Sequence, residues 1–447
     1  MASGLTLNLK KILFIYIFTC AVSSYLGGPV IYGLIVLYSL YWVLLKDNEL
    51  KSTNYLCLSI FIIAFISILV NFKDIEPVFR PGERIIMLLI VMLAFSPIIN
   101  NKTTFLYRKK IFIYFTIGLI VMAVASAILA FTGFGYVKGL LLGLSNWPNS
   151  LGYALGISII ATLVNLNKSK WIIKILCVLV IGLSIITIPK TGTRTTWYSM
   201  PVIIFLFIYF NSISIISIIK KTVIITVSFT LFFIAVTPDL SIIEAKNEIA
   251  RERGENSREQ LFNTRIKEFK TAPIFGIGTF RCLTQYQKVN ANGNVEGGNS
   301  FLTSLSMNGI VGLVVLLLFY IGTIYGFCKY IWKKRKQELS KFEQYLCLVL
   351  VFNFIYMLQA GALLNPGFYI TGFNWLSLSM AYMYPRYIDN NIDWIRNVHF
   401  LYPQKDLYPA HRCLYGSPAR SVVPVAAVSL SCLSLTSTAP VLHSRIR

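Results

Sequence analysis

The sequence predicts an all-α polytopic membrane protein with about twelve transmembrane helices, and three observations support this class. Hydrophobic residues make up 56% of the 447 residues and charged residues only 13%, fewer than a soluble chain of this length needs at its surface. Apolar runs long enough to cross a bilayer, roughly 20 residues each, recur along the chain. Basic residues fall on alternate loops between these runs.

The apolar runs define the expected spans. They lie near 12–27, 29–45, 54–71, 84–99, 111–132, 147–166, 171–188, 197–215, 221–237, 301–328, 344–364 and 368–385. Only Gly27 and Gly28 separate the first two runs, so the alternative is a chain of eleven spans.

Lysine and arginine set the expected orientation, because basic residues are retained on the cytoplasmic side of a membrane. The basic loops alternate and contain Lys10 and Lys11, Lys46 and Lys51, 108–110, Lys168 and Lys170, Lys220 and Lys221, and 333–336. Both termini are therefore expected in the cytoplasm, and the long polar segment 239–299 outside. The net charge of +23 is spread over many loops instead of one basic stripe, which argues against a nucleic-acid partner.

The composition changes near Asp389, so we divide the chain into a transmembrane body, 1–388, and a tail, 389–447. We interpret the tail as a disordered cytoplasmic extension or a frame-shifted gene end, with a regulatory segment as the alternative. All three histidines, His399, His411 and His443, fall in this tail. Chemistry at the outer face must therefore use carboxylates, arginines or the substrate itself.

The outer segment 239–299 is the expected location of function, because a lipid-embedded chain has little reason to build a long polar excursion unless something polar is handled there. It contains Arg251, Arg253, Arg258, Arg265 and Arg281. These arginines indicate an anionic ligand.

A first candidate motif, 190–197, joins two spans on the expected outer side with the sequence Lys-Thr-Gly-Thr-Arg-Thr-Thr-Trp. Gly192 permits a tight turn, the threonines and backbone amides donate hydrogen bonds, and Lys190 and Arg194 carry positive charge. This combination suits a phosphate or diphosphate. Interfacial anchoring of the two basic side chains is the alternative.

A second motif begins at Ser257 and Arg258 and continues through a predicted helix to a Pro-Ile-Phe-Gly-Ile-Gly turn at 273–278. A helix places Arg258, Arg265 and Glu268 near one face. A solvated helix face is the alternative, and we expect it for Arg251, Arg253 and Lys267. Glycines among large apolar residues predict a buried, sharply bent turn.

A third motif runs from Glu296 through Asn299 and Leu302 to Gly309 and Gly312. In this order and on this side, the three motifs resemble the O-antigen ligase and polymerase superfamily, membrane glycosyltransferases that move glycans carried on undecaprenyl diphosphate. The resemblance covers roughly residues 188–318 and the span layout. The matching residues are Arg194, Arg258, Gly276, Gly278, Asn299, Leu302, Gly309 and Gly312.

The resemblance implies a GT-C-like architecture with one large periplasmic loop, in a bacterial inner membrane. The implied partners are an undecaprenyl-diphosphate-linked oligosaccharide, membrane lipid and a separate chain-length regulator protein. Arg194, Arg258 and Arg281 are expected to hold the diphosphate, which leaves as a sugar hydroxyl attacks with inversion. The other expected substrate-binding residues are Lys190, Arg265, Asn299, Arg80 and Arg84, the last two with membrane anchoring as their alternative role.

One departure from the family concerns the catalytic base. Gly298 stands where the family's ligases carry histidine, which favours a polymerase of repeat units over a ligase. Glu296 is the expected base, with Glu268 as the competitor. No acidic metal-ligand cluster occurs on the outer side, so no metal or other cofactor is expected. Trp147 and Tyr286 are candidates for stacking on sugars, with a place in the aromatic belt at the membrane surface as the alternative.

Three alternatives remain on the sequence alone. A ligase would transfer the glycan to lipid A core. A non-catalytic transporter would bind an anionic solute at the same basic residues, although nearly charge-free spans without an internal repeat disfavour alternating access. A structural partner of a polysaccharide assembly complex would not need Arg194 or Arg258.

Overall fold

The computed structural model describes residues 2–23, 26–45, 51–137, 139–145, 147–166, 170–212, 214, 216–224, 227, 258–286, 298–334, 339–361 and 363–388. All of them belong to the first of two units, Met1–Phe400. Four predicted features lie wholly or mostly outside the described residues: the tail 389–447, the ninth span 221–237, the pair Arg251 and Arg253, and the proposed base Glu296.

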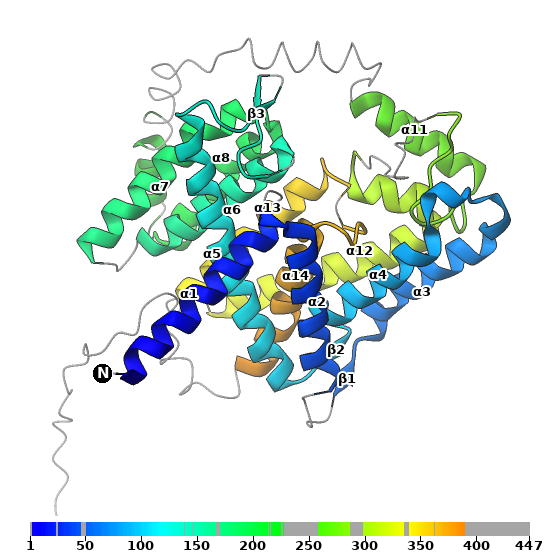
Figure 1. Ribbon diagram of the computed structural model, residues 1–447, viewed down its shortest axis with the longest axis horizontal. Coiled ribbons are helices and arrows are strands. Elements are labelled where there is room, and N and C mark those ends of the chain that lie inside the picture. The colour runs from blue at the N-terminus through cyan, green and yellow to red at the C-terminus, as the bar shows by residue number, and fades with distance from the viewer. Residues whose placement is uncertain are drawn as a thin grey trace, which may run out of the picture. The chain divides into compact units, whose positions relative to one another are not determined.

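Helices dominate the described residues (Figure 1), as the sequence predicts. They are α1 (Ala2–Val22), α2 (Gly28–Leu44), α3 (Tyr55–Val70), α4 (Pro81–Phe95), α5 (Lys102–Ala130), α6 (Pro148–Leu166), α7 (Trp171–Lys190), α8 (Arg194–Phe210), α11 (Arg258–Thr271), α12 (Ser300–Lys334), α13 (Lys341–Met357) and α14 (Tyr369–Ile388), with short 3-10 turns η2 (Phe72–Asp74) and η3 (Pro77–Phe79).

The all-α expectation omitted two small antiparallel strand pairs. In the first, β1 (Ser52–Thr53) pairs with β2 (Ile99–Asn100), and Ser52 lies opposite Asn100. In the second, β3 (Tyr136–Val137) and β4 (Leu140–Leu141) form a hairpin between α5 and α6. These two-residue strands join loops and leave the helical architecture unchanged.

The expected spans agree with the helices, except that the ninth, 221–237, falls mostly outside the described residues. The alternative of one continuous span at the N-terminus is wrong. Gly27 adopts a left-handed conformation with φ 76° between α1 and α2, which ends one helix before Pro29 begins the next.

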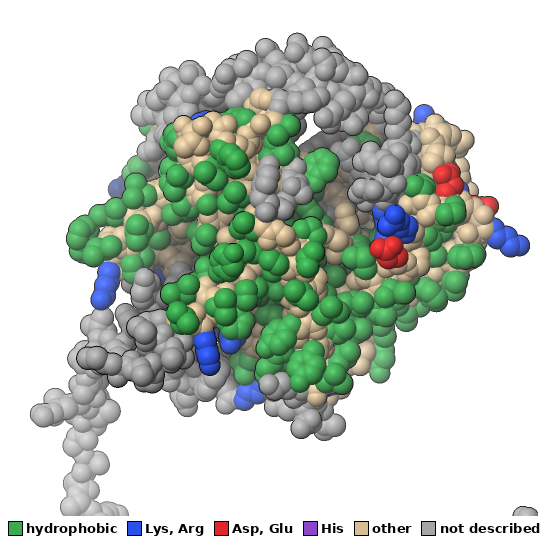
Figure 2. Space-filling view, in the orientation of Figure 1, with side chains coloured by type: hydrophobic (Ala, Val, Ile, Leu, Met, Phe, Trp, Pro, Cys, Tyr) green, Lys and Arg blue, Asp and Glu red, His purple; other side chains and the backbone are tan. Residues whose placement is uncertain are grey.

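Four described helices, α5, α6, α7 and α12, are long and apolar enough to cross a membrane, and α2 and α3 are shorter apolar helices. On α7 the side chains of Trp171, Ile172, Ile175, Leu176, Val178 and Leu179 are between 47% and 70% exposed. Hydrophobic side chains also cover much of the described surface in Figure 2. An apolar surface of this extent suits contact with lipid and supports the predicted class of helical membrane protein. The count of twelve spans and the GT-C architecture stay predictions.

Several polar side chains inside the helix core form hydrogen bonds, which offset the cost of their burial away from water. The Tyr153 hydroxyl on α6 donates to Asn353 Oδ1 on α13 at 2.7 Å, and Asn353 Nδ2 donates to Ser377 Oγ on α14 at 2.9 Å. The fully buried Arg108 on α5 donates to the carbonyls of Leu93 and Ala94, at the end of α4. These bonds fix neighbouring helices at defined positions.

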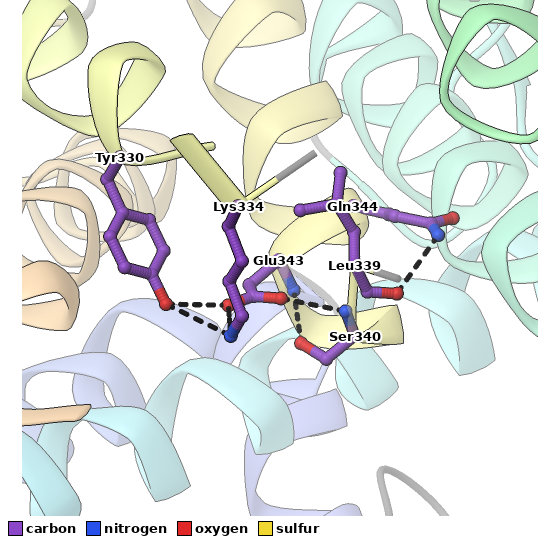
Figure 3. A network of polar contacts seen from close by, with 6 residues as sticks. All are labelled: Tyr330, Lys334, Leu339, Ser340, Glu343 and Gln344. Atoms are coloured by element: carbon purple, nitrogen blue, oxygen red, sulfur yellow. Dashed lines mark hydrogen bonds and ion pairs between the residues drawn. The ribbon is translucent and has the colours of Figure 1, made fainter. Parts of the chain in front are cut away.

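A second polar network joins the end of α12 to the start of α13 (Figure 3). The buried Glu343 carboxylate accepts hydrogen bonds from Lys334 Nζ at 2.6 Å and Tyr330 Oη at 2.8 Å. Its other oxygen accepts from the Ser340 amide, while Ser340 Oγ accepts from the Glu343 amide. This capping box begins α13 after the loop that follows the basic cluster 333–336. The bonds from Tyr330 and Lys334 to Glu343 hold the end of α12 against the start of α13.

Candidate functional site

Helix α12 is broken at Gly309, which has the non-helical angles φ 68° and ψ −169°. The break exposes backbone groups on both sides, and the turn that follows α11 satisfies them. The amides of Ile277 and Gly278 donate to the carbonyls of Ser306 and Met307, at 3.0 and 3.2 Å. In return, the Ile310 amide donates to the Pro273 carbonyl at 2.9 Å. The second and third motifs therefore form one unit.

Two glycines make this contact sterically feasible. A Cβ atom on Gly276 would lie 2.3 Å from the carbonyl carbon of Met307, and one on Gly309 would lie 2.1 Å from the Ile274 oxygen. Gly276 also has φ 71°, a conformation that favours glycine. The predicted buried turn is confirmed only for its second half, because 276–280 are buried whereas Pro273 and Ile274 are exposed.

Helix α3 holds the turn from a third side, which the sequence analysis missed. Asn71 Nδ2 donates to the Gly276 carbonyl at 3.0 Å, and Ser67 Oγ donates to the Met307 carbonyl at 2.6 Å. The Thr279 hydroxyl donates to the Ala64 carbonyl at 2.9 Å. Ser67 and Asn71 are small polar residues at the end of an apolar span, a pattern common to many spans. Only their contacts in the folded structure reveal that they hold the turn.

Within α11 the predicted helix face contains a buried ion pair. Arg265 Nη1 lies 2.7 Å from Glu268 Oε2, and both side chains have no exposed area. Glu268 Oε1 accepts from the Leu283 amide at 2.9 Å, and Arg265 Nη1 also reaches Ser306 Oγ at 3.5 Å. Both carboxylate oxygens are thus engaged. The pair ties α11 to the segment after the turn and to α12.

Arg258 begins α11, and the structure describes its backbone only. Lys267 is exposed, as expected, and its ammonium lies 5.7 Å from the centroid of the exposed Tyr286 ring. The partly buried Arg281 donates from Nη1 to the Ile277 carbonyl at 3.2 Å. Next to it, burial raises the pKa of the Cys282 thiol to about 12.

Asn299, an expected substrate ligand, begins α12 and acts as its N-cap. Its Oδ1 accepts from the amides of Phe301 and Leu302 at 2.8 and 3.0 Å. Its Nδ2 donates to the Leu358 carbonyl at 2.8 Å. The neighbouring Ser300 hydroxyl donates to the Ala360 carbonyl. The start of α12 is therefore fastened to the loop between α13 and α14.

The first motif forms the turn between α7 and α8. Gly192 has φ 61°, Arg194 is exposed in the first turn of α8, and the threonine side chains at 191, 193, 195 and 196 are buried. Thr193 Oγ1 donates to the Pro148 carbonyl at 3.2 Å, and Thr196 Oγ1 to the Gly152 carbonyl at 3.0 Å. Lys190 lies with its Nζ atom 5.2 Å from the centroid of the Phe131 ring.

The loop after α13 links the first motif to the third. Thr195 Oγ1 donates to Gln359 Oε1, one residue from the Leu358 carbonyl that Asn299 contacts. The sequence analysis missed Gln359, because a lone glutamine after an apolar span carries no local signal. The three motifs, separated along the chain, thus share one region of the structure.

The loop that contains Arg80 lies beside this region. Thr284 Oγ1 donates to Glu76 Oε1 at 3.3 Å, and a Cβ atom on Gly278 would lie 3.0 Å from Ile75. The exposed Arg80 lies 3.8 Å from Glu83 in the same turn, and Arg84 is half-buried at the start of α4. The substrate-binding roles expected for these arginines stay predictions.

The sequence also matches a known protein family over this region. Residues 178–317 match the model of the family described as O-antigen ligase. This stretch is similar to the O-antigen ligase family. It begins in α7, ends in α12 beyond Gly312 and contains all three motifs, so the expected resemblance is confirmed. No curated protein matches the chain. Members of the O-antigen ligase family are glycosyltransferase-like enzymes acting on lipid-linked glycans.

Proposed function

We propose that this protein polymerises lipid-diphosphate-linked oligosaccharide repeat units into an O-antigen or capsular-type polysaccharide at the outer face of the bacterial cytoplasmic membrane. The observation that carries the proposal is the convergence of the three motifs within the O-antigen ligase region. Thr195 contacts Gln359, Asn299 contacts Leu358, and the turn at 273–278 completes the broken helix α12.

We propose that Arg194 and Arg258 bind the diphosphate, with further charge supplied by Lys190 and Arg281. Arg194 and Arg258 each lie in the first turn of a helix, where the helix dipole favours an anion. Guanidinium groups stabilise the negative charge that grows on the diphosphate as the anomeric bond breaks. The attacking sugar hydroxyl forms the new glycosidic bond through its oxygen and gives its proton to the proposed base, Glu296, while the diphosphate leaves with the electron pair of the broken anomeric bond.

The exposed and buried arginines have different proposed roles. Arg194 is exposed, whereas Arg265 is engaged by Glu268 inside the protein. We therefore assign to Arg265 the role of positioning α11, which in turn positions Arg258 at the start of that helix. Glu268 is a poor candidate base because its carboxylate is buried and accepts two hydrogen bonds. Glu296 remains the proposed base, and its Glu296→Gln variant is expected to lose activity.

The identity of residue 298 supports a polymerase over a ligase. Gly298 stands where the family's ligases carry histidine, so this position has no imidazole to serve as a base. A ligase reaction onto lipid A core remains the second candidate. A transporter is the third, supported only by the many apolar helices.

The proposal is tested with surface polysaccharide from cells that lack the protein and are complemented with wild type, Arg194→Ala or Arg258→Ala. We expect the arginine variants to lose the polymer ladder and to retain a single repeat unit on its anchor. Arg386→Ala is the matched control, because this exposed arginine lies in the last turn of α14, on the expected cytoplasmic side.

Two other outcomes would contradict the polymerase. Loss of all attached glycan, with lipid-linked polymer accumulating, would identify a ligase. Unchanged ladders in both arginine variants would favour a structural partner, because neither the polymerase nor the transporter proposed here could lose these charges without effect.

A further inference from the structure

Lys109 lies near the end of α5 that is remote from the first motif. The other end of α5, at Ala130, precedes Phe131, whose ring contacts Lys190 of that motif. A helix rises about 1.5 Å per residue, so Lys109 is about 30 Å from Ala130, roughly the thickness of a bilayer core. The positions of the basic loops make this the expected cytoplasmic face.

The Lys109 side chain is buried without a polar partner. The residue is only 9% exposed, and its Nζ atom lies 4.8 Å from the centroid of the Phe342 ring and 5.9 Å from that of Tyr384. The ammonium has no hydrogen-bond or ion-pair partner among the residues that the structure describes. Nζ keeps accessible surface, unlike enclosed polar atoms such as Tyr32 Oη, so a ligand can reach it. A buried ammonium with three N–H donors and no acceptor is unfavourable, which points to an acceptor from outside.

The nearest carboxylate is already engaged by other groups. Glu343, at the start of α13, is the only carboxylate that the structure describes at this face. Its Oε1 atom accepts hydrogen bonds from Lys334 and Tyr330, and its Oε2 atom accepts from the Ser340 amide (Figure 3). Glu343 therefore neutralises Lys334 and leaves the charge of Lys109 unpaired.

Arg108, the residue before Lys109, adds a second buried cation but solves its burial differently. Its guanidinium donates to the carbonyls of Leu93 and Ala94 at the end of α4, where the helix dipole favours a cation. Lys109 has no such carbonyls among the described residues. Because the buried cations exceed the carboxylates at this face, the ligand that completes Lys109 should be an anion.

The position of Lys109 favours a lipid phosphate over a soluble anion. Helix α5 is long and apolar enough to cross a membrane, and headgroup phosphates lie at the ends of such helices. The stem of Lys109 lies against aromatic rings, which suits the boundary between headgroups and acyl chains. The phosphodiester of an anionic phospholipid carries one negative charge, which matches one ammonium.

We propose that Lys109 binds the phosphate of an anionic phospholipid at the membrane face remote from the first motif. The Phe342 and Tyr384 rings hold the stem of the lysine, and the phosphate accepts the hydrogen bonds of its ammonium. Phe342 lies at the start of α13, next to the Glu343 that holds the end of α12, so the bound lipid stabilises this junction. The proposal does not depend on the polymerase function.

The test is native mass spectrometry of the delipidated full-length protein, titrated with phosphatidylglycerol or with diacylglycerol of the same acyl chains, which lacks the phosphate. We expect saturable binding of phosphatidylglycerol to wild type, with Kd raised about tenfold in Lys109→Met and retained within about threefold in Lys109→Arg. Lys110→Met is the matched control, because Lys110 carries the same charge at an exposed position of the same helix. Its Kd should change by less than about twofold.

Thermal unfolding separates loss of the ligand from loss of the fold. Without added lipid, Lys109→Met should melt at or above the wild-type temperature, because it removes an unpaired buried charge. Added phosphatidylglycerol should raise the melting temperature of wild type and of Lys110→Met, but not that of Lys109→Met. A large drop in the melting temperature of lipid-free Lys109→Met would show that the ammonium has a partner within the protein, and would overturn the proposal.

Two further results would overturn the proposal. Equal Kd values for phosphatidylglycerol in wild type and Lys109→Met would show that the lysine does not bind the phosphate, as would equal binding of phosphatidylglycerol and diacylglycerol by wild type. Displacement of phosphatidylglycerol by glycerol 3-phosphate at a similar concentration would assign the site to a soluble phosphate ester instead of a lipid.

Discussion

Gly276 and Gly309 each pack directly against the backbone of the segment that contains the other glycine. Gly309 packs on the Ile274 carbonyl and the Gly276 amide nitrogen, and Gly276 packs on Met307 and Asn308. This contact converts a break in a long apolar helix into a joint whose exposed amides and carbonyls are satisfied by another segment. A kink of this kind positions the start of α12, where Asn299 lies, relative to α11.

We predict that Gly276→Ala and Gly309→Ala each disrupt this joint. Both residues have φ near 70°, and the added methyl group would overlap backbone atoms that have no free space to move into. The expected destabilisation is at least about 2 kcal/mol, with loss of polymer in cells. Thermal unfolding in detergent measures it.

Gly326→Ala is the matched control for the glycine variants. This glycine also lies in α12, but nothing lies within 4 Å of the position that its Cβ would take. Its substitution should keep or slightly raise the melting temperature, because alanine favours a helix. Equal effects at 309 and 326 would contradict the importance of the joint.

A second prediction concerns the Arg265–Glu268 pair. Arg265→Met leaves a buried carboxylate without its cation, which typically costs about 3–5 kcal/mol, so we expect little folded protein. The double variant Arg265→Met/Glu268→Gln removes both charges and keeps an acceptor for the Leu283 amide. It should recover much of the lost stability.

The double variant also separates positioning from substrate binding. A folded double variant that makes polymer supports positioning by Arg265, whereas a folded but inactive one supports direct contact with the diphosphate. Lys267→Met, on an exposed side chain of the same helix, serves as the control. Protein yield, melting temperature and the polysaccharide ladder are the three readouts.

A third prediction addresses the bridge between the first and third motifs. Thr195→Val preserves side-chain shape but removes the hydroxyl that donates to Gln359 Oε1. Stability should fall by only about 1 kcal/mol, while polymer formation falls more, because the turn that holds Arg194 loses its link to the loop after α13. Thr132→Val, at an exposed hydroxyl bonded to the Leu129 carbonyl, should affect neither property. A proportional loss of both properties in Thr195→Val would contradict a positioning role.

A fourth prediction concerns thiol reactivity. Burial raises the pKa of Cys282 to about 12, so the thiol stays protonated at pH 8, with roughly a thousandfold less thiolate than an ordinary cysteine. Maleimide labelling followed by peptide mapping should show negligible modification of Cys282 before denaturation, and a rate that rises with pH. In a Thr284→Cys variant, the new cysteine at this exposed position should react at an ordinary rate. Equal labelling rates at 282 and 284 would show that the Cys282 thiol is accessible to solvent, which would contradict its burial.

Much of the helical architecture and of the candidate site could be predicted from the sequence, because both depend on local patterns. Long apolar runs specify helices such as α5 and α12, since a membrane-spanning backbone must satisfy its own hydrogen bonds. The glycines at 276 and 278 marked a buried turn, and the order of the motifs indicated the O-antigen ligase family before the match at 178–317 confirmed it.

Other features depended on contacts between residues far apart in the sequence. The pairing of Thr195 with Gln359, and of Asn71 with Gly276, joins segments separated by more than a hundred residues, and no local pattern encodes such a pair. Likewise, Arg194 and Arg265 look alike in the sequence, and tertiary packing alone exposes the first and buries the second against Glu268. The sequence by itself determined the helices, the turn and the family. Only the tertiary structure decided which side chains are buried against one another and which are exposed, because burial and hydrogen-bond partners arise when the helices pack.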